Sequence, residues 1–297
     1  SLKVEATSGD LTIADGTLDV SGTAQHFYDV TKYTDGGNIQ LVADNGDMQI
    51  NAGSTVSVAA TSGGGSAGSL AVSVAQGHFS IDADTLRGQA GANGQGGSFS
   101  LDTLGIGEDT SLSHLDTLGK ALADGGFERS IDVRVREGDV IADGTIRAHE
   151  IGLGADHGSI LVTGTLDASG LVGATRSDPL GGAMNVADPT GGQIDLNASG
   201  NVEIDSTAWL SAVGYAYNYA GKGGSITLSA GSYTVDANGV EQVDTGAKVD
   251  IRSGARIDLD VLHKFTPNDL LTNPGVLLPV SDRMDLFAGT MNLRETQ

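Results

Sequence analysis

The sequence lacks several features that would point to common classes of protein. It has no cysteine among its 297 residues, which excludes a disulfide framework and any metal site built on thiolates. No apolar run approaches the roughly 18 residues of a transmembrane helix, so we expect no insertion into a membrane. Lysine and arginine number 16 against 38 acidic residues, a formal net charge of −22. Because nucleic acids and anionic membranes attract basic surfaces, this balance argues against both as partners.

The chain also has few prolines and few aromatic residues, but it is rich in glycine. It contains five prolines, 4% aromatic residues and 45 glycines, and this glycine share is about twice the usual 7%. Glycine at this frequency, without a collagen period or a proline-rich tract, indicates many turns rather than disorder. We therefore expect a folded body built from many short elements.

One motif recurs along almost the whole chain. Each copy is a glycine pair, or a near-pair, followed by residues that alternate between apolar and polar. We refer to these copies as start motifs, and they begin at Gly36 (GGNIQLVA), Ala67 (AGSLAVSVA), Gly96 (GGSFSLDT), His157 (HGSILVTG), Gly191 (GGQIDLNA) and Gly223 (GGSITLSA). A period of two is typical of a β-strand with one buried face. Regular strands at irregular intervals are the sign of a solenoid with loop insertions.

The stretch 191–214 shows the repeating unit most clearly. Three alternating runs, QIDLNA, NVEID and AWLSA, follow one another there, with Gly200 and then Ser206–Thr207 between them. We predict an all-β fold, a right-handed parallel β-helix with three short strands per rung, in which residues 1–297 are a single shaft segment of a longer chain. The predicted inward side chains of this rung are Ile194, Leu196, Val202, Ile204, Leu210 and Ala212, and the outward ones are Asp195, Asn197, Glu203 and Asp205.

The alternative fold is an antiparallel β-sandwich. The segments ADNGD (Ala43–Asp47) and ADGT (at Ala14 and again at Ala142) resemble the two-residue turns of β-hairpins. Against this alternative, the same three-strand unit returns along the chain in place of varied strands. A coil in which each strand pairs with its equivalent in the next rung explains this repetition directly.

Two stretches depart from the strand pattern. Near residues 105–126 a short amphipathic helix is predicted, because Leu112, Leu115, Leu118 and Leu122 are spaced as on one helix face. Thr110 or Ser111 would cap its start, and Gly125–Gly126 would end it. This helix would be a structural flap on the coil or, alternatively, a docking surface. Near residues 263–280 three of the five prolines indicate an extended loop.

The predicted loops suggest where a partner would bind. Five insertions precede start motifs and would leave the coil at one corner: Ala24–Asp35, Thr61–Ser66, Gly88–Gln95, Leu171–Thr190 and Tyr215–Lys222. In a solenoid, insertions on one face mark the binding face. The candidate binding residues are the loop tyrosines and one outward tryptophan: Tyr28, Tyr33, Tyr215, Tyr217, Tyr219 and Trp209. Their rings would stack on sugars or anchor a protein, or else cover the corner of the core.

Motifs for catalysis are missing from the sequence. It has no GxSxG, HExxH, phosphate-binding or EF-hand segment, so we expect no cofactor, no metal site and no enzymatic activity. The alternative is a carbohydrate-active β-helix enzyme, in which Asp195 and Asp205 would face one groove as a pair of carboxylates. Acidic residues are so frequent at outward positions that such a pair is expected by chance.

Three segments carry a resemblance to a known family. GGFERSIDVRVREGDV, IRAHEIGLGADHGSILVTGTLDASG and GGQIDLNASGNVEIDSTAWLSAVG resemble the repeat region of large filamentous-haemagglutinin-type exoproteins of two-partner secretion systems. The resemblance implies a β-helical shaft on the bacterial cell surface or in the medium, with a role in adhesion, aggregation or biofilm building. It also implies that an outer-membrane partner exports the longer parent chain, and that the ligand is a surface glycan, a surface protein or a matrix polysaccharide.

Overall fold

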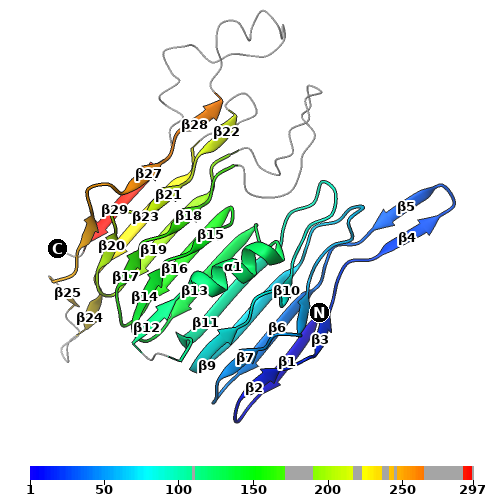
Figure 1. Ribbon diagram of the computed structural model, residues 1–297. Helices are drawn as coiled ribbons and strands as arrows, with labels where there is room; N and C mark the ends of the chain where they lie inside the picture. The colour runs from blue at the N-terminus through cyan, green and yellow to red at the C-terminus, as the bar shows by residue number, and fades with distance from the viewer. Residues whose placement is uncertain are drawn as a thin grey trace, which may run out of the picture.

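The computed structural model of the chain is built almost entirely from short β-strands, with one helix among the residues it describes (Figure 1). The structure describes residues 1–108, 111–170, 190–216, 223–235, 241–243, 246–263 and 290–295. The predicted extended loop near 263–280 therefore lies almost wholly outside the described residues. The strands lie side by side in parallel sheets, so the all-β class and the parallel arrangement are as predicted.

The largest sheet has 11 strands and is called the main sheet here. Its hydrogen-bonded path runs through β1 (Leu2–Ala6), β6 (Asn38–Ala43), β9 (Ser69–Ile81), β11 (Ser98–Ile106), β13 (Ser130–Val135), β16 (Glu150–Ala155), β19 (Gln193–Ala198), β23 (Ser225–Ala230) and β29 (Thr290–Glu295). Every neighbouring pair along this path is parallel. The register places similar residues side by side. For example, Leu196 of β19 is level with Leu153 of β16 and with Leu228 of β23.

Two further stacks of parallel strands run beside this path. The second stack begins with β2 (Leu11–Ile13) and β7 (Met48–Ile50), which complete the 11 strands of the main sheet because β2 pairs with β7 and β7 pairs with the end of β9. It continues with β12 (Leu112–His114), β14 (Asp139–Ala142), β17 (Ile160–Val162), β20 (Val202–Ile204) and β26 (Val249–Ile251). The third stack consists of β3 (Thr17–Asp19), β8 (Thr55–Ser57) and β10 (Leu86–Arg87), followed by β15 (Thr145–Arg147), β18 (Thr165–Asp167), β21 (Trp209–Ser211) and β27 (Arg256–Asp258). A short parallel pair, β22 (Gly214–Ala216) and β28 (Val261–His263), follows the third stack along the chain.

Antiparallel pairing is confined to small features of the described residues. These are the hairpins β4 (Ala24–Phe27)–β5 (Val30–Tyr33) and β24 (Tyr233–Val235)–β25 (Glu241–Val243), and a bridge between Thr61 and Gly64. The ADNGD and ADGT segments do not form hairpins, since the strands on either side of each turn pair with other partners. The antiparallel sandwich is therefore wrong.

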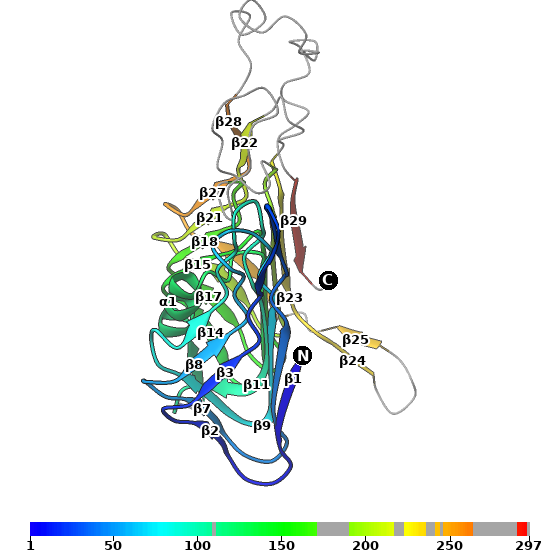
Figure 2. The ribbon, with the colours of Figure 1, turned by 90° about the vertical axis from the view of Figure 1, so that its right-hand side faces the viewer.

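The three runs of 191–214 become three strands in three stacks. They are β19 in the main sheet, β20 in the second stack and β21 in the third. The six predicted inward side chains are all buried, with 0% of their surface exposed: Ile194, Leu196, Val202, Ile204, Leu210 and Ala212. The chain bends at Gly200 and makes a turn at Ser206–Thr207. The interior lies between the stacks, and Figure 2 shows the main sheet opposite the strands of the third stack.

One of the six start motifs is not equivalent to the others. The motif at His157 becomes β17, which belongs to the second stack, whereas five other start motifs become main-sheet strands. The main-sheet strand of that layer is β16, and neither β16 nor β13 follows a glycine pair directly. Glycine followed by alternation also occurs at other corners of this fold, so the motif alone does not identify the strand.

The glycine pairs of the start motifs have a steric cause. Gly192 and Gly224 lie directly before β19 and β23, where the backbones of adjacent layers are in contact. A Cβ atom on Gly224 would collide with the carbonyl oxygen of Gly192, and one on Gly192 would collide with that of His149. Those oxygens accept hydrogen bonds from the next layer, including Ser225 N–H to Gly192 at 2.9 Å. The position therefore requires glycine for close approach.

The predicted helix exists but starts later than expected. Residues Leu112–His114 form β12, and α1 (Asp116–Gly125) follows, with Leu115 at its N-cap and no capping side chain. The proposed caps at Thr110 and Ser111 are therefore wrong. The predicted end is confirmed, since Gly126 adopts the left-handed conformation with φ of 77°. Leu112 belongs to a strand because residues 112–114 pair in parallel with β14, where Leu112 is level with Asp139.

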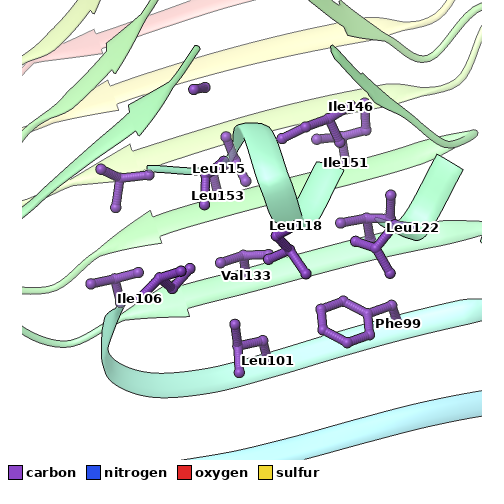
Figure 3. Close-up of a cluster of buried hydrophobic side chains, with 14 of the residues drawn as sticks. Phe99, Leu101, Ile106, Leu115, Leu118, Leu122, Val133, Ile146, Ile151 and Leu153 are labelled. Atoms are coloured by element: carbon purple, nitrogen blue, oxygen red, sulfur yellow. The ribbon is translucent and has the colours of Figure 1, made fainter. Parts of the chain in front are cut away.

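Helix α1 covers a level at which the third stack has no strand. It contacts both β10 and β15, which end the two separate parts of that stack. Its buried residues Leu118, Ala121 and Leu122 join the core (Figure 3). Gly119 permits this approach, because a Cβ there would lie 2.9 Å from the carbonyl oxygen of Thr145. The helix thus acts as a structural cover of the core.

Candidate functional site

Three of the five predicted insertions lie together at one corner. They are residues 24–35, 61–66 and 88–95, and we call this set the loop corner. The backbone N–H of Ser66 donates to the Asp35 carboxylate at 2.7 Å, and Gly91 N–H donates to the Gly65 carbonyl at 2.9 Å. Each insertion is thus bonded to the next. The predicted insertion 171–190 lies outside the described residues except for Thr190, and 215–222 except for its first two residues.

The first insertion forms a two-stranded hairpin, β4–β5, that projects from the body of the protein (Figure 1). Phe27 and Val30 are level with each other across the hairpin, and Tyr28 is at the turn with φ of 53°. Tyr28 is fully exposed, while Phe27 and Val30 are 48% and 52% exposed. Their side chains give the hairpin an apolar tip, defined here as Phe27, Tyr28 and Val30.

Tyr33 lies at the base of the same hairpin and has a different environment. A Cβ atom on Gly64 would lie 2.7 Å from Cδ2 of Tyr33, and one on Gly63 would collide with its hydroxyl end. The ring therefore lies against the backbone of the second insertion at Gly63 and Gly64, where any larger residue would collide with it. Tyr33 remains 42% exposed. This contact matches the interpretation that a loop tyrosine covers the corner, whereas Tyr28 is free to meet a partner.

Trp209 points outward as predicted, but it is not part of the loop corner. It is 38% exposed on β21, and the Arg256 guanidinium lies 4.7 Å from its ring centre. The hairpin follows β3, at the opposite end of the third stack from β21. Five elements lie between these two strands, namely β8, β10, α1, β15 and β18. The structure therefore does not bring Trp209 together with Tyr28 and Tyr33.

The remaining candidate tyrosines are described only in part. Tyr215 lies in β22, whose backbone pairs with β28, and its side chain is outside the described part of the structure. Tyr217 and Tyr219 lie outside the described residues altogether. Their role in binding stays a prediction.

The predicted site missed Phe27 and Val30. The signal for both was available, since Ala24–Phe27 and Val30–Tyr33 flank a two-residue turn and contain apolar residues level with each other. Interpreted as a loop, the segment predicts contact only through its tyrosines. As a hairpin it places Phe27 and Val30 beside Tyr28.

The predicted carboxylate pair is not formed. Asp195 is an outward residue of the main sheet, whereas Asp205 follows β20 of the second stack. Asp205 accepts hydrogen bonds from the Thr207 backbone N–H and from the Thr207 and Ser206 hydroxyl groups, each at 3.1 Å. The first of these bonds is the main reason that the pKa of Asp205 lies below its usual value. Asp205 thus serves a turn, and the two acids do not share a groove.

Three further observations concern partners and relatives. In the described part of the chain, histidines and acidic residues do not gather into a group of three or more able to hold a metal ion. The helix described is too short and too polar to cross a membrane. No family model, curated protein or solved structure matches the chain.

Proposed function

We propose that the chain is a right-handed parallel β-helix that serves as a non-catalytic shaft segment of a bacterial adhesin of the filamentous-haemagglutinin type. Three stacks of parallel strands, each with inward residues level with those of the next layer, support the coil. Connections between parallel strands in one sheet are right-handed in about 98% of cases, which supports the hand. A stack whose layers contact only their neighbours is well suited to a rigid spacer.

The apolar tip of hairpin β4–β5 is the observation that favours adhesion. A two-stranded hairpin is at most marginally stable alone, and this one presents three exposed apolar side chains away from the core. The rest of the chain is strongly acidic, so an anionic ligand would be repelled. We expect the partner to be a neutral glycan or a protein on a host or bacterial surface, or a matrix polysaccharide. The location would be extracellular or on the bacterial surface, with export of the parent chain by an outer-membrane partner.

A bead-adhesion experiment tests this function. The protein is coupled to beads, and retention on cultured host cells and on bacterial lawns is compared with that of the variant F27S/Y28S. Adhesion is expected to fall several-fold while circular dichroism stays unchanged, because both side chains are exposed. Gln25→Ser, a change of an exposed polar residue on the same hairpin, is the matched control and is expected to adhere normally.

Two results would contradict the proposal. The first is normal adhesion by F27S/Y28S, which would mean that the tip is not the contact surface. The second is release of reducing ends or unsaturated products from a glycan panel, which would support the alternative of a carbohydrate-active enzyme. With Asp195 and Asp205 apart, such an enzyme would require another pair of acids.

A further inference from the structure

A trough crosses the outward face of the main sheet, far along the stack from the hairpin. It has a volume of about 610 Å³ and is lined by residues of β13, β16 and β19. Its floor is β16, whose outward positions include Gly152 and Gly154. In register with them are Asp132 and Asp195 on one row and Arg134 and Asn197 on the next. The trough exists because the middle strand of the three has no side chain at these two positions.

The floor offers no backbone groups to a ligand. Strand β16 pairs over all six residues with β13 on one side and with β19 on the other, so its amides and carbonyls are engaged in the sheet. Of its side chains, Ile151, Leu153 and Ala155 are buried in the core, whereas Glu150 at the start of the strand is exposed and lines one end of the trough. A peptide strand would find neither main-chain partners nor apolar pockets here. Recognition must come from Glu150 and from the polar side chains of the two walls.

The walls contain both donors and acceptors of hydrogen bonds. Asp132 leans over the floor, since a Cβ on Gly152 would lie 3.0 Å from its Oδ1, and its carboxylate has no hydrogen-bond partner among the described residues. Partial burial, and then the charge of Asp102, raise the pKa of Asp132. Arg134 is held by Asp156, to which its Nε donates at 3.0 and 3.1 Å. On the opposite wall the Gln193 amide donates to Asp195.

The width of the trough suits a sugar ring. Strands β13 and β19 lie on either side of β16, so their backbones are about 10 Å apart. A six-membered ring lying on the glycine floor would place its hydroxyl groups within hydrogen-bonding reach of Asp132, which leans over the floor, and of Asp195 on the opposite wall. Carboxylates accept hydrogen bonds from hydroxyl groups and repel anions, and Arg134 is already neutralised by Asp156.

We propose that this trough binds an uncharged, hydroxyl-rich glycan, with Asp132 and Asp195 as its main acceptors. The site is separate from the apolar tip of the hairpin, and it does not depend on the proposed adhesive role of that tip. Its floor glycines distinguish it from neighbouring parts of the same sheet face, where outward positions have side chains.

Titration calorimetry with neutral hexasaccharides of glucose, mannose and N-acetylglucosamine tests the proposal. Polygalacturonate and a hexalysine peptide serve as anionic and cationic comparators. Gly154→Thr fills the floor, and a Cβ there would meet nothing closer than Arg134 Cγ at 3.8 Å, an ordinary contact. Threonine also favours strands. We expect this variant to fold normally and to weaken glycan binding at least ten-fold. Asp132→Ala is expected to do the same by removing an acceptor.

The control is Gln40→Thr, an exposed position of β6 in the same sheet but outside the trough, and its affinity should equal that of the wild type. F27S/Y28S should also bind normally, which separates this site from the hairpin. The proposal is overturned if no neutral glycan binds, if only hexalysine or polygalacturonate binds, or if Gly154→Thr and Gln40→Thr bind equally well while both remain folded.

Discussion

Replacing Leu196 by alanine tests whether stability in this protein passes from layer to layer. Leu196 has 0% of its surface exposed and is level with Leu153 and Leu228 in the adjacent strands, which are 1% and 0% exposed. The change removes three buried carbon groups at about 0.8 kcal/mol each and leaves a cavity between two fixed neighbours. The free energy of unfolding is expected to fall by about 3–5 kcal/mol in total.

The loss should be local, because each layer contacts mainly its neighbours. Hydrogen exchange followed by mass spectrometry should show at least about 100-fold faster exchange in peptides that cover β16, β19 and β23, since 1.4 kcal/mol corresponds to a factor of ten. Peptides of β1 and β6 should be unchanged. Asn197→Ala, an exposed neighbour on the same strand, is the control and should have little effect. Uniformly faster exchange along the whole chain would refute the layer-by-layer account.

Two further predictions concern charge and glycine. The pKa of Asp102 lies below its usual value of 3.8, chiefly because Arg136 donates two hydrogen bonds of 2.7 Å to it. The ionised Asp102 therefore stabilises the fold fully at pH values above 3.8. This contribution to stability is lost as the pH falls through the lower pKa of the folded protein. Asp102→Asn should therefore lower the urea midpoint at pH 7, and an equal difference at pH 2 would contradict the assignment. Gly224→Ala should destabilise the protein by about 1–3 kcal/mol through overpacking and lower its thermal midpoint. Gly16→Ala should change the thermal midpoint little, because a Cβ there meets nothing closer than 3.6 Å. Similar midpoints for both variants would contradict the steric argument and show that the backbone at Gly224 can relax.

The sequence predicted the repeating unit well because burial and alternation are local properties. Ile194, Val202 and Leu210 could be assigned to the interior from their own runs alone. The strand at His157 was treated as equivalent to the other copies, because its true place depends on pairing partners such as β20 that are distant in the chain. The helix start was wrong for a related reason, since β12 exists through its pairing with β14 and not through its own composition.

The candidate sites were harder to predict than the strands. Tyr28 and Tyr33 are five residues apart in the sequence, yet one is exposed at a turn and the other covers the glycines of a different loop. Trp209 was grouped with these tyrosines as a candidate binding residue, but its position along the third stack separates it from Tyr28 and Tyr33. The trough could not be predicted from the sequence because it forms where side chains are missing. Gly152 and Gly154 make a floor only when the side chains of β13 and β19 stand on either side of them.

The level occupied by α1 has a mechanical consequence. There the third stack is divided between β10 and β15, and the second stack resumes only at β12, so among the described strands the main sheet alone crosses this level by continuous pairing, from β11 to β13. A pulling or bending force along the stack would thus pass mainly through one face. The opposite face is held by packing against the helix and by isolated backbone hydrogen bonds at its ends, from Gly88 N–H to Gly125 at 2.6 Å and from Leu115 N–H to Ile141 at 3.0 Å. We therefore expect the protein to bend more easily at the level of α1 than at the levels where all three stacks are continuously paired, and to bend toward one side.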